Sequence, residues 1–150
     1  MRITGVDNTS FSVSNLERSV EFYIGVLGCQ VIWQREITDQ YFRDIVGFPQ
    51  AVVKAAHLRL PGSTHKLELF EYVQPRGGAG ELHPNDLGNA HLSFLVEDLT
   101  ASYEELQGRG IRFRSPPVLI DHGANAGGYA LYLLDPDGIN VELFQPAKGA

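Results

Sequence analysis

The chain has 150 residues, of which 43% are hydrophobic and 20% charged, so it has the composition of one compact domain with a sizeable core. Its net charge of −6 disfavours a nucleic-acid-binding protein, because phosphate binding needs clustered Lys and Arg. The single cysteine, Cys29, excludes an internal disulfide, and no apolar run approaches the roughly 20 residues of a membrane span. We therefore expect a cytoplasmic protein without a membrane segment.

The first part of the chain predicts a strand, a helix and three further strands. Residues 5–13 alternate as in a half-buried strand, with Phe11 and Val13 facing the core. A capping-box signature at residues 14–17 starts a helix that ends at Gly28. Further strands are predicted at 29–36, 51–60 and 65–73, with a short helix or lid-like excursion at 37–50.

The same order of elements then starts again. Residues 74–88 are rich in Gly and Pro and form a predicted connector. Asp98 can cap a second helix that ends at Gly110, and a turn at 135–138 precedes the last strand. The strands of this part are predicted near 91–96, 111–114, 128–134 and 139–145. We expect one domain over 1–150, made of modules at about 1–73 and 89–150.

The two modules also repeat each other residue by residue. Asn8 is followed by Phe, Val, Leu and Ser at offsets of 3, 5, 8 and 11, and His91 is followed by the same residue types at the same offsets. The run Leu-Glu-Leu-Phe around Glu68 likewise matches Val-Glu-Leu-Phe around Glu142. Asn8 and His91, and Glu68 and Glu142, therefore hold matching positions in a duplicated unit.

Strand alternation predicts that these four residues lie on faces that no helix covers. Neighbouring apolar residues take the core side, which leaves Asn8, Glu68, His91 and Glu142 on the opposite side. A curved sheet would turn that side into a cleft. Two modules arranged around a pseudo-twofold axis would bring the four residues into one site.

The residue types of this set suit a divalent cation. One imidazole and two carboxylates form a mixed nitrogen and oxygen set for Zn, Ni, Co, Mn or Fe, whereas Asn8 adds only a weaker amide oxygen. A single glutamate on a strand is more often solvated, and a single histidine is more often structural. The matching positions of Glu68 and Glu142, taken with His91, favour a metal site.

Other residues on the same strand faces are predicted to line a substrate pocket. They combine hydroxyl groups, one imidazole and aromatic rings, and they are Ser10, Ser12, His57, Phe70, Tyr72, Ser93 and Phe144. His57 is the best candidate among the histidines that lack a counterpart in the other module, because its strand should flank the site. No base is spaced from these serines as in a hydrolase triad.

The motifs together resemble those of the vicinal oxygen chelate superfamily. The resemblance covers the run from Asn8 to Ser19, Phe22-Tyr23, Leu27-Gly28, His91 and the stretch from Asp135 to Leu143. That superfamily includes glyoxalase I, methylmalonyl-CoA epimerase, extradiol dioxygenases, and fosfomycin and bleomycin resistance proteins. The resemblance implies an α+β fold of two βαβββ modules with a curved mixed sheet around a metal-binding cleft, usually in a homodimer.

The resemblance also implies roles for the matching residues. Glu68, His91 and Glu142 would be metal ligands, with Asn8 where the superfamily most often has His. We expect a metal-dependent lyase or isomerase of the glyoxalase and epimerase type, acting on a small carbonyl or vicinal-oxygen substrate through an enolate. Glu142 is the first candidate for the catalytic base and Glu68 the second. The alternatives are an Fe(II) or Mn(II) ring-cleaving dioxygenase, disfavoured by Asn8, and a drug-sequestering resistance protein that needs no metal.

Overall fold

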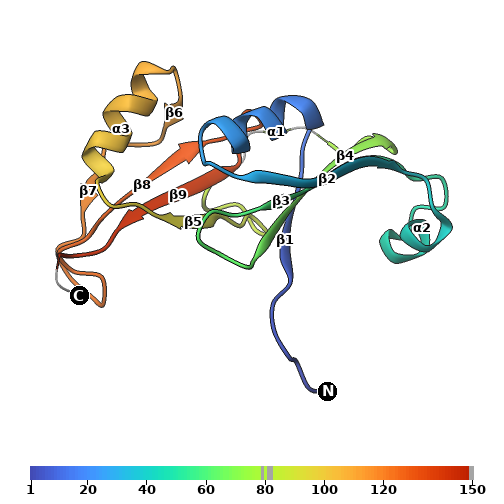
Figure 1. Cartoon of the computed structure of the whole chain (residues 1–150), viewed down its shortest axis with the longest axis horizontal. Coiled ribbons are helices and arrows are strands. Elements are labelled where there is room, and N and C mark those ends of the chain that lie inside the picture. Colours follow the sequence, from blue (N-terminus) through green and yellow to red (C-terminus); the bar gives the residue numbers. More distant parts are fainter. Residues whose placement is uncertain (79, 81–82, 149–150) are drawn as a thin grey trace. The chain divides into compact units, whose positions relative to one another are not determined.

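The computed structural model divides the chain into two compact units, Met1–Gly80 (unit 1) and Glu81–Ala150 (unit 2). It describes residues 1–78, 80 and 83–148. Positions 79, 81 and 82 of the predicted connector lie outside the described residues. Figure 1 shows a mixed sheet in each unit, with α1 and α2 in unit 1 and α3 in unit 2. In the described part of the chain, no helix combines the length and apolar character that a membrane crossing requires.

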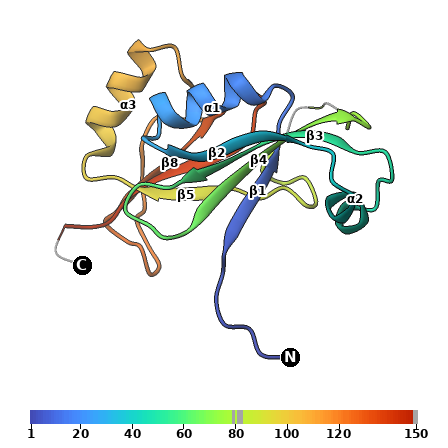
Figure 2. The ribbon, with the colours of Figure 1, turned by 45° about the vertical axis from the view of Figure 1, so that its right-hand side comes forward.

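Unit 1 is a four-stranded mixed sheet with two helices. Its elements are β1 (Asn8–Ser12), α1 (Leu16–Gly25), β2 (Gln30–Ile37), α2 (Gln40–Val46), β3 (Val52–Arg59) and β4 (Lys66–Gln74). The strand order is β1-β4-β3-β2, in which β1 runs parallel to β4 and the other neighbours are antiparallel. Figure 2 shows α1 along one face of this sheet and α2 at one end. The excursion at 37–50 therefore contains a helix.

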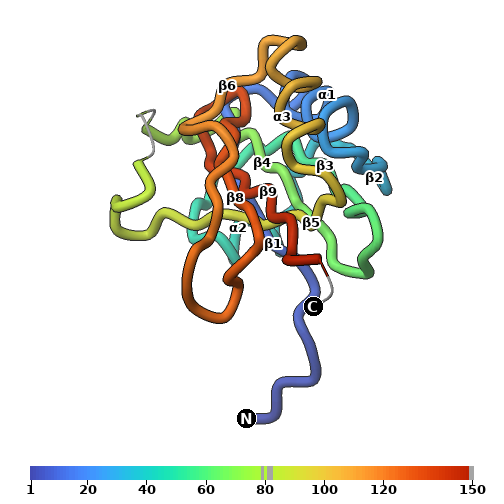
Figure 3. Tube along the Cα trace, turned by 90° about the vertical axis from the view of Figure 1, so that its left-hand side faces the viewer, coloured from blue at the N-terminus to red at the C-terminus, as the bar shows by residue number. Residues whose placement is uncertain are grey.

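Unit 2 repeats this strand order. Its elements are β5 (Leu92–Leu95), α3 (Leu99–Gly108), β6 (Arg112–Phe113), β7 (Val118–Leu119), β8 (Tyr129–Leu134) and β9 (Asn140–Gln145). The order β5-β9-β8-β6 has β5 parallel to β9, and β7 pairs with β8 as a short strand that the sequence did not predict. Figure 3 shows the loop between β7 and β8 in orange. The predicted α+β fold with a repeated βαβββ order is confirmed.

The helix caps lie at Asp98, as predicted, and at Asn15, one residue after the Ser14 of the predicted capping box. Asn15 Oδ1 accepts a hydrogen bond from Arg18 N at 2.8 Å, and Asp98 Oδ1 accepts one from Ala101 N at 2.9 Å. Each bond satisfies a backbone N–H that has no partner within its helix. The sequence therefore located the start of α3 at its predicted cap and the start of α1 to within one residue.

A second cap at each helix start comes from the closing strand of the same sheet. Glu71 Oε2 on β4 accepts a hydrogen bond from Leu16 N at 2.9 Å, and Gln145 Oε1 on β9 accepts one from Leu99 N at 2.7 Å. Glu71 and Gln145 each lie three residues beyond the glutamate of the repeated motif. An odd spacing sends them to the opposite face of the strand, where the helix packs.

We call the face of each sheet opposite α1 or α3 its site face. On the helix side of β4, Leu67 and Leu69 are fully buried, and Val141 and Leu143 are buried on the helix side of β9. Glu68 and Glu142 alternate with these residues. Both glutamates are therefore on the site faces of their own sheets.

A second apolar cluster occupies part of the site face of unit 1. It consists of buried residues from β2, β3 and the α2 segment, with partly buried side chains packed against them: Ile37, Phe42, Ala51, Val53, Ala55, Trp33, Val46, Phe70 and Tyr72. The cluster fixes α2 on the sheet, since burial of these side chains stabilises the contact. Helix α2 therefore covers the apolar end of this face.

The buried cap provides a stability test. Removal of the carboxylate in Glu71→Ala leaves Leu16 N without its acceptor and should lower the free energy of unfolding by about 1–3 kcal/mol. Glu71→Gln keeps an amide oxygen, as Gln145 does in unit 2, and should lose less. Urea unfolding followed by circular dichroism measures both, with the exposed Glu21→Ala as control. Equal losses in the Ala and Gln variants would contradict the cap.

Cys29 should behave as a buried structural residue. Its side chain is 2% exposed, and burial raises the pKa of its thiol to about 11. At pH 8 only roughly one thiol in a thousand would be ionised at that pKa. We expect iodoacetamide to leave the native protein unlabelled and to modify one site per chain in denaturant, as measured by mass spectrometry. Stoichiometric labelling of the native protein within minutes would contradict this assignment.

Candidate functional site

Four side chains form a row across the site face of unit 1. The register pairs Ser10 with Glu68, Glu68 with His57, and His57 with Trp33. The row therefore takes one residue from each of β1, β4, β3 and β2. Directly paired residues point to the same face of a sheet, so these four side chains are neighbours.

The carboxylate of Glu68 is the centre of this row. Ser10 Oγ donates a hydrogen bond to Glu68 Oε2 at 2.8 Å, and His57 Nε2 contacts Glu68 Oε1. The ring of Trp33 packs on the imidazole of His57 with centroids 4.1 Å apart and planes inclined by 31°. The side chains of His57 and Glu68 are only 17% and 15% exposed. Both oxygens of Glu68 thus have a protein partner.

The surroundings of His57 favour its neutral form. Burial is the largest effect and lowers the pKa of His57, while the negative charge of Glu68 partly opposes it. A neutral imidazole donates from one nitrogen and accepts at the other. The contact with Glu68 assigns the donor to Nε2. His57 therefore acts as a neutral hydrogen-bond donor to Glu68 near neutral pH.

Asn8 belongs to the next row of the same face. It pairs in register with Lys66, and its Nδ2 donates to Asp7 Oδ2 at 3.1 Å. Ser10 Oγ is 3.4 Å from Asn8 Oδ1, a longer distance than the one to Glu68. Lys66 Nζ forms an ion pair with Asp7 Oδ1 at 2.8 Å. The amide of Asn8 is thus engaged with its immediate neighbours.

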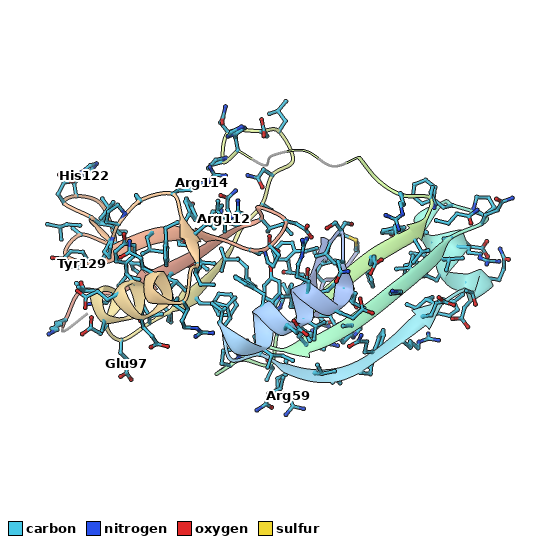
Figure 4. The ribbon with its side chains drawn as sticks, turned by 90° about the horizontal axis from the view of Figure 1, so that it is seen from above. Arg59, Glu97, Arg112, Arg114, His122 and Tyr129 are labelled. Carbon is cyan, nitrogen blue, oxygen red and sulfur yellow. The ribbon has the colours of Figure 1, made fainter. Side chains whose placement is uncertain are left out.

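Unit 2 has an equivalent row with different residue types. The register pairs Ser93 with Glu142 and Glu142 with Tyr132, and Arg114 N donates to Tyr132 O at 2.9 Å. Tyr132 therefore stands where unit 1 has His57, and Arg114 stands where unit 1 has Trp33. Figure 4 labels Arg114 beside Arg112, at the β6 edge of this sheet.

His91 approaches Glu142 from the chain just before β5. Its Nε2 lies 3.5 Å from Glu142 Oε2 and 3.4 Å from the hydroxyl of Tyr132, whose ring packs edge-on against the imidazole. The side chains of His91 and Glu142 are 44% and 25% exposed, more than those of the pair in unit 1. Unit 2 therefore also places one imidazole beside one carboxylate, and this pair is more exposed to solvent.

Sequence reasoning did not single out Tyr132. Burial raises the pKa of its hydroxyl, and the negative charge of Glu142 raises it further. The hydroxyl consequently stays protonated near neutral pH and can donate a hydrogen bond. The sequence indicated the face of Tyr132 only through its alternation with Leu131 and Leu133, which face the core. The pairing with Glu142 could be seen only in the register.

The predicted aromatic residues of unit 1 pack against α2 and the residues just after it. The ring of Phe70 packs edge-on against Phe42 at 5.6 Å, and the ring of Tyr72 against Phe48 at 6.2 Å. Ser12 pairs in register with Phe70. Beyond Tyr72, a pocket of about 340 Å³ is lined by Phe48, Pro49, Gln50, Gln74 and Pro75. In unit 2, Phe144 pairs with Leu95 and Ala130.

The donor atoms fit a divalent ion only as part of a larger set. Among the residues that the structure describes, no three His, Cys, Asp or Glu side chains are grouped closely enough to bind a metal. Each unit contributes one imidazole and one carboxylate, His57 with Glu68 and His91 with Glu142. A protein metal site ordinarily uses three or more ligands of these types. Each pair therefore has suitable donor atoms but too few of them to form a metal site by itself.

Comparisons with known proteins identify the family. Residues 5–143 match the Glyoxalase/Bleomycin resistance protein/Dioxygenase superfamily. A 2-epi-5-epi-valiolone epimerase from Actinomyces sp. is 32% identical over 97% of this chain and 81% of its own length. A probable lactoylglutathione lyase from Synechocystis is 24% identical over 94% of this chain and 95% of its own. A glyoxalase family protein from Bacillus cereus has the same fold, with a TM-score of 0.83 and 19% identity over 98% of this chain and 97% of its own. The chain belongs to the Glyoxalase/Bleomycin resistance protein/Dioxygenase superfamily.

Proposed function

We propose that this protein is a divalent-metal-dependent enzyme that moves a proton at the carbon next to a carbonyl group of a small molecule. The observation that carries the proposal is the pairing of one imidazole with one carboxylate on the site face of each unit. Nitrogen and oxygen donors of these types bind Zn, Ni, Co, Mn and Fe. The relative that is an epimerase, with similarity over 97% of this chain, supports proton transfer as the reaction.

Glu68, His91 and Glu142 are the proposed metal ligands, together with a fourth donor from unit 1. The sequence repeat assigns this fourth position to Asn8, the counterpart of His91. Each unit by itself supplies only part of this set.

Glu142 is the proposed catalytic base. It is more exposed than Glu68, and His91 lies beside it at 3.5 Å, whereas both oxygens of Glu68 have close partners in Ser10 and His57. A carboxylate can accept the proton next to the carbonyl and return it to the same carbon. The protonated hydroxyl of Tyr132 can donate to a substrate oxygen. A divalent ion, when bound, would stabilise the negative charge that develops on that oxygen.

A ring-cleaving dioxygenase remains the second candidate because of one observation. Fe(II) oxygenases use two imidazoles and one carboxylate, and His57 gives unit 1 an imidazole beside Glu68 although Asn8 replaces the usual His. Oxygen uptake by iron-loaded protein with catechols would favour this reaction. Proton exchange without oxygen uptake would favour the epimerase type.

Metal dependence is the first prediction of this proposal. Purified protein should contain or bind one divalent ion per ligand set, measured by elemental analysis, and Glu68→Ala and Glu142→Ala should each weaken binding strongly. Glu97→Ala removes an exposed glutamate of unit 2 and is the matched control. Ligand binding that needs no metal and is unchanged in both site variants would contradict the proposal and favour a drug-sequestering protein.

Proton transfer gives the second prediction. Metal-loaded protein in D₂O should exchange hydrogen next to the carbonyl in members of a panel of small hydroxyketones, followed by NMR. Glu142→Gln retains the size of the side chain but removes the base, so the exchange rate should fall about 100-fold or more. Chelator-treated protein should also be inactive until a metal is restored. Full exchange by Glu142→Gln would assign the base to another residue.

A further inference from the structure

We propose that Arg114 binds an oxyanion, a carboxylate or phosphate group, of the small molecule that reacts at Glu142. This inference rests on the proposed function, because it names the class of substrate at the same site: a carbonyl compound that also carries a negatively charged group. Every residue that carries the argument belongs to unit 2.

The end of strand β6 directs Arg114 to the site face of unit 2. The ring of Phe113 packs against Tyr103 of α3, with centroids 4.8 Å apart, so Phe113 faces the helix. Phe113 also pairs in register with the buried Leu133. The pairing with β8 continues through the next residue, because Arg114 N donates to Tyr132 O at 2.9 Å. Side chains alternate along a strand, so Arg114 lies on the face opposite α3.

The side chain of Arg114 crosses β8 and reaches β9. Its Nε donates a hydrogen bond to Asn140 Oδ1 at 2.5 Å. Asn140 is the first residue of β9 and precedes Glu142 by two positions, so these two side chains point to the same face. Two residues along a strand span about 6.5 Å. An anion bound by this guanidinium is therefore within the length of a small molecule from the carboxylate of Glu142.

The chemistry of the guanidinium suits an oxyanion. It is planar, always charged, and carries five N–H donors that can bind a carboxylate or phosphate through two parallel hydrogen bonds. The bond to Asn140 uses the Nε–H donor and restricts the side chain, which reduces the entropy lost when a ligand binds. Because the amide of Asn140 is neutral, this bond orients the guanidinium without cancelling its charge.

The amide of Asn140 forms this bond at a cost to stability. Its side chain is 1% exposed, and its Nδ2 is a buried donor that has no hydrogen-bond partner in the part of the chain that the structure describes. A buried donor without an acceptor is destabilising, and such groups are exceptions in native proteins. The orientation of Arg114 explains this one, because Oδ1 must face Nε for the bond to form.

The negative charge of Glu142 fixes the direction in which such a ligand binds. A carboxylate repels an anionic group, so the charged end of the ligand lies toward Arg114 and its carbonyl end toward Glu142. Tyr132 separates the two charges on the strand between them. The ligand class is therefore a short carbonyl compound with a carboxylate or phosphate at one end.

The competing explanation is that the bond between Arg114 and Asn140 only stabilises the edge of the sheet. A structural role affects all ligands alike, whereas an anion site distinguishes charged from neutral ligands. Suitable probes share one ketone and differ in charge: dihydroxyacetone is neutral, dihydroxyacetone phosphate carries a phosphate, and hydroxypyruvate carries a carboxylate. Inorganic phosphate serves as the probe without a ketone.

The test measures the affinity of each probe for the chelator-treated full chain by NMR titration. We expect at least one charged ketone to bind about 10- to 100-fold more tightly than dihydroxyacetone. Arg114→Gln should abolish this preference, and Arg114→Lys should keep part of it, because an ammonium retains the charge but not the planar fork. Arg109→Gln, which removes a charge paired with Glu105 on α3, is the matched control and should keep the full preference.

The signal of the Arg114 Nε–H group gives a local readout in the same titration. It is identified by its loss in Arg114→Lys, and it should shift with the preferred charged ketone but not with dihydroxyacetone. Circular dichroism confirms that each variant is folded. The comparison of charged and neutral probes in the unaltered protein needs no variant.

The outcomes distinguish this inference from the proposed function. Equal binding of charged and neutral ketones, or a preference that survives in Arg114→Gln, would overturn the anion site. Inorganic phosphate that binds as tightly as dihydroxyacetone phosphate would overturn its assignment to a substrate. A preference that depends on Arg114, without hydrogen exchange in any probe by the metal-loaded protein, would support the anion site and overturn the proposed proton transfer.

Discussion

The alternation of side chains along the closing strands β4 and β9 is the constraint on which both units depend. Glu68 and Glu71 are three residues apart on β4, as are Glu142 and Gln145 on β9, so each pair serves opposite faces. The second member caps the helix, and the first lies on the site face. A shift of one residue in register would exchange the two faces and lose both contacts at once. The stability of each helix start is therefore linked to the orientation of the proposed ligand.

The two units share the same strand order but surround their glutamates with different residues. In unit 1 the glutamate is almost enclosed by Ser10 and His57, and in unit 2 the glutamate has a more exposed partner in His91 and a tyrosine hydroxyl beside it. Under the proposed function, the more enclosed Glu68 would hold a cation and the more exposed Glu142 would accept a proton. The two glutamates of the repeat therefore differ in burial and in their partners.

Local sequence signals predicted much of the fold. The helix starts and the strand alternation depend on residues close together in the chain, and the structure has Asp98 as the expected cap and Asn15 as a cap one residue from the expected position. The caps from Glu71 and Gln145 were missed, because each joins residues 55 and 46 positions apart in the sequence. The short strand β7 was also missed. Its two residues carry too little pattern to be recognised.

The site was less predictable for the same reason. Alternation placed the glutamates on the correct faces, but the partner of each glutamate depends on the register between neighbouring strands. That register is set by turns and packing across the sheet, so the sequence indicated His57 only as a pocket residue and did not show that Tyr132 is paired with Glu142. The position of α2 over Phe70 likewise depends on tertiary packing.

Anomalous diffraction from crystals of the metal-loaded protein tests the central claim most directly. We predict one strong anomalous peak per ligand set, with the donor atoms of Glu68, His91 and Glu142 at about 2.0 to 2.2 Å from it. A metal bound only at an exposed histidine such as His122, with both glutamates beyond bonding distance, would contradict this account.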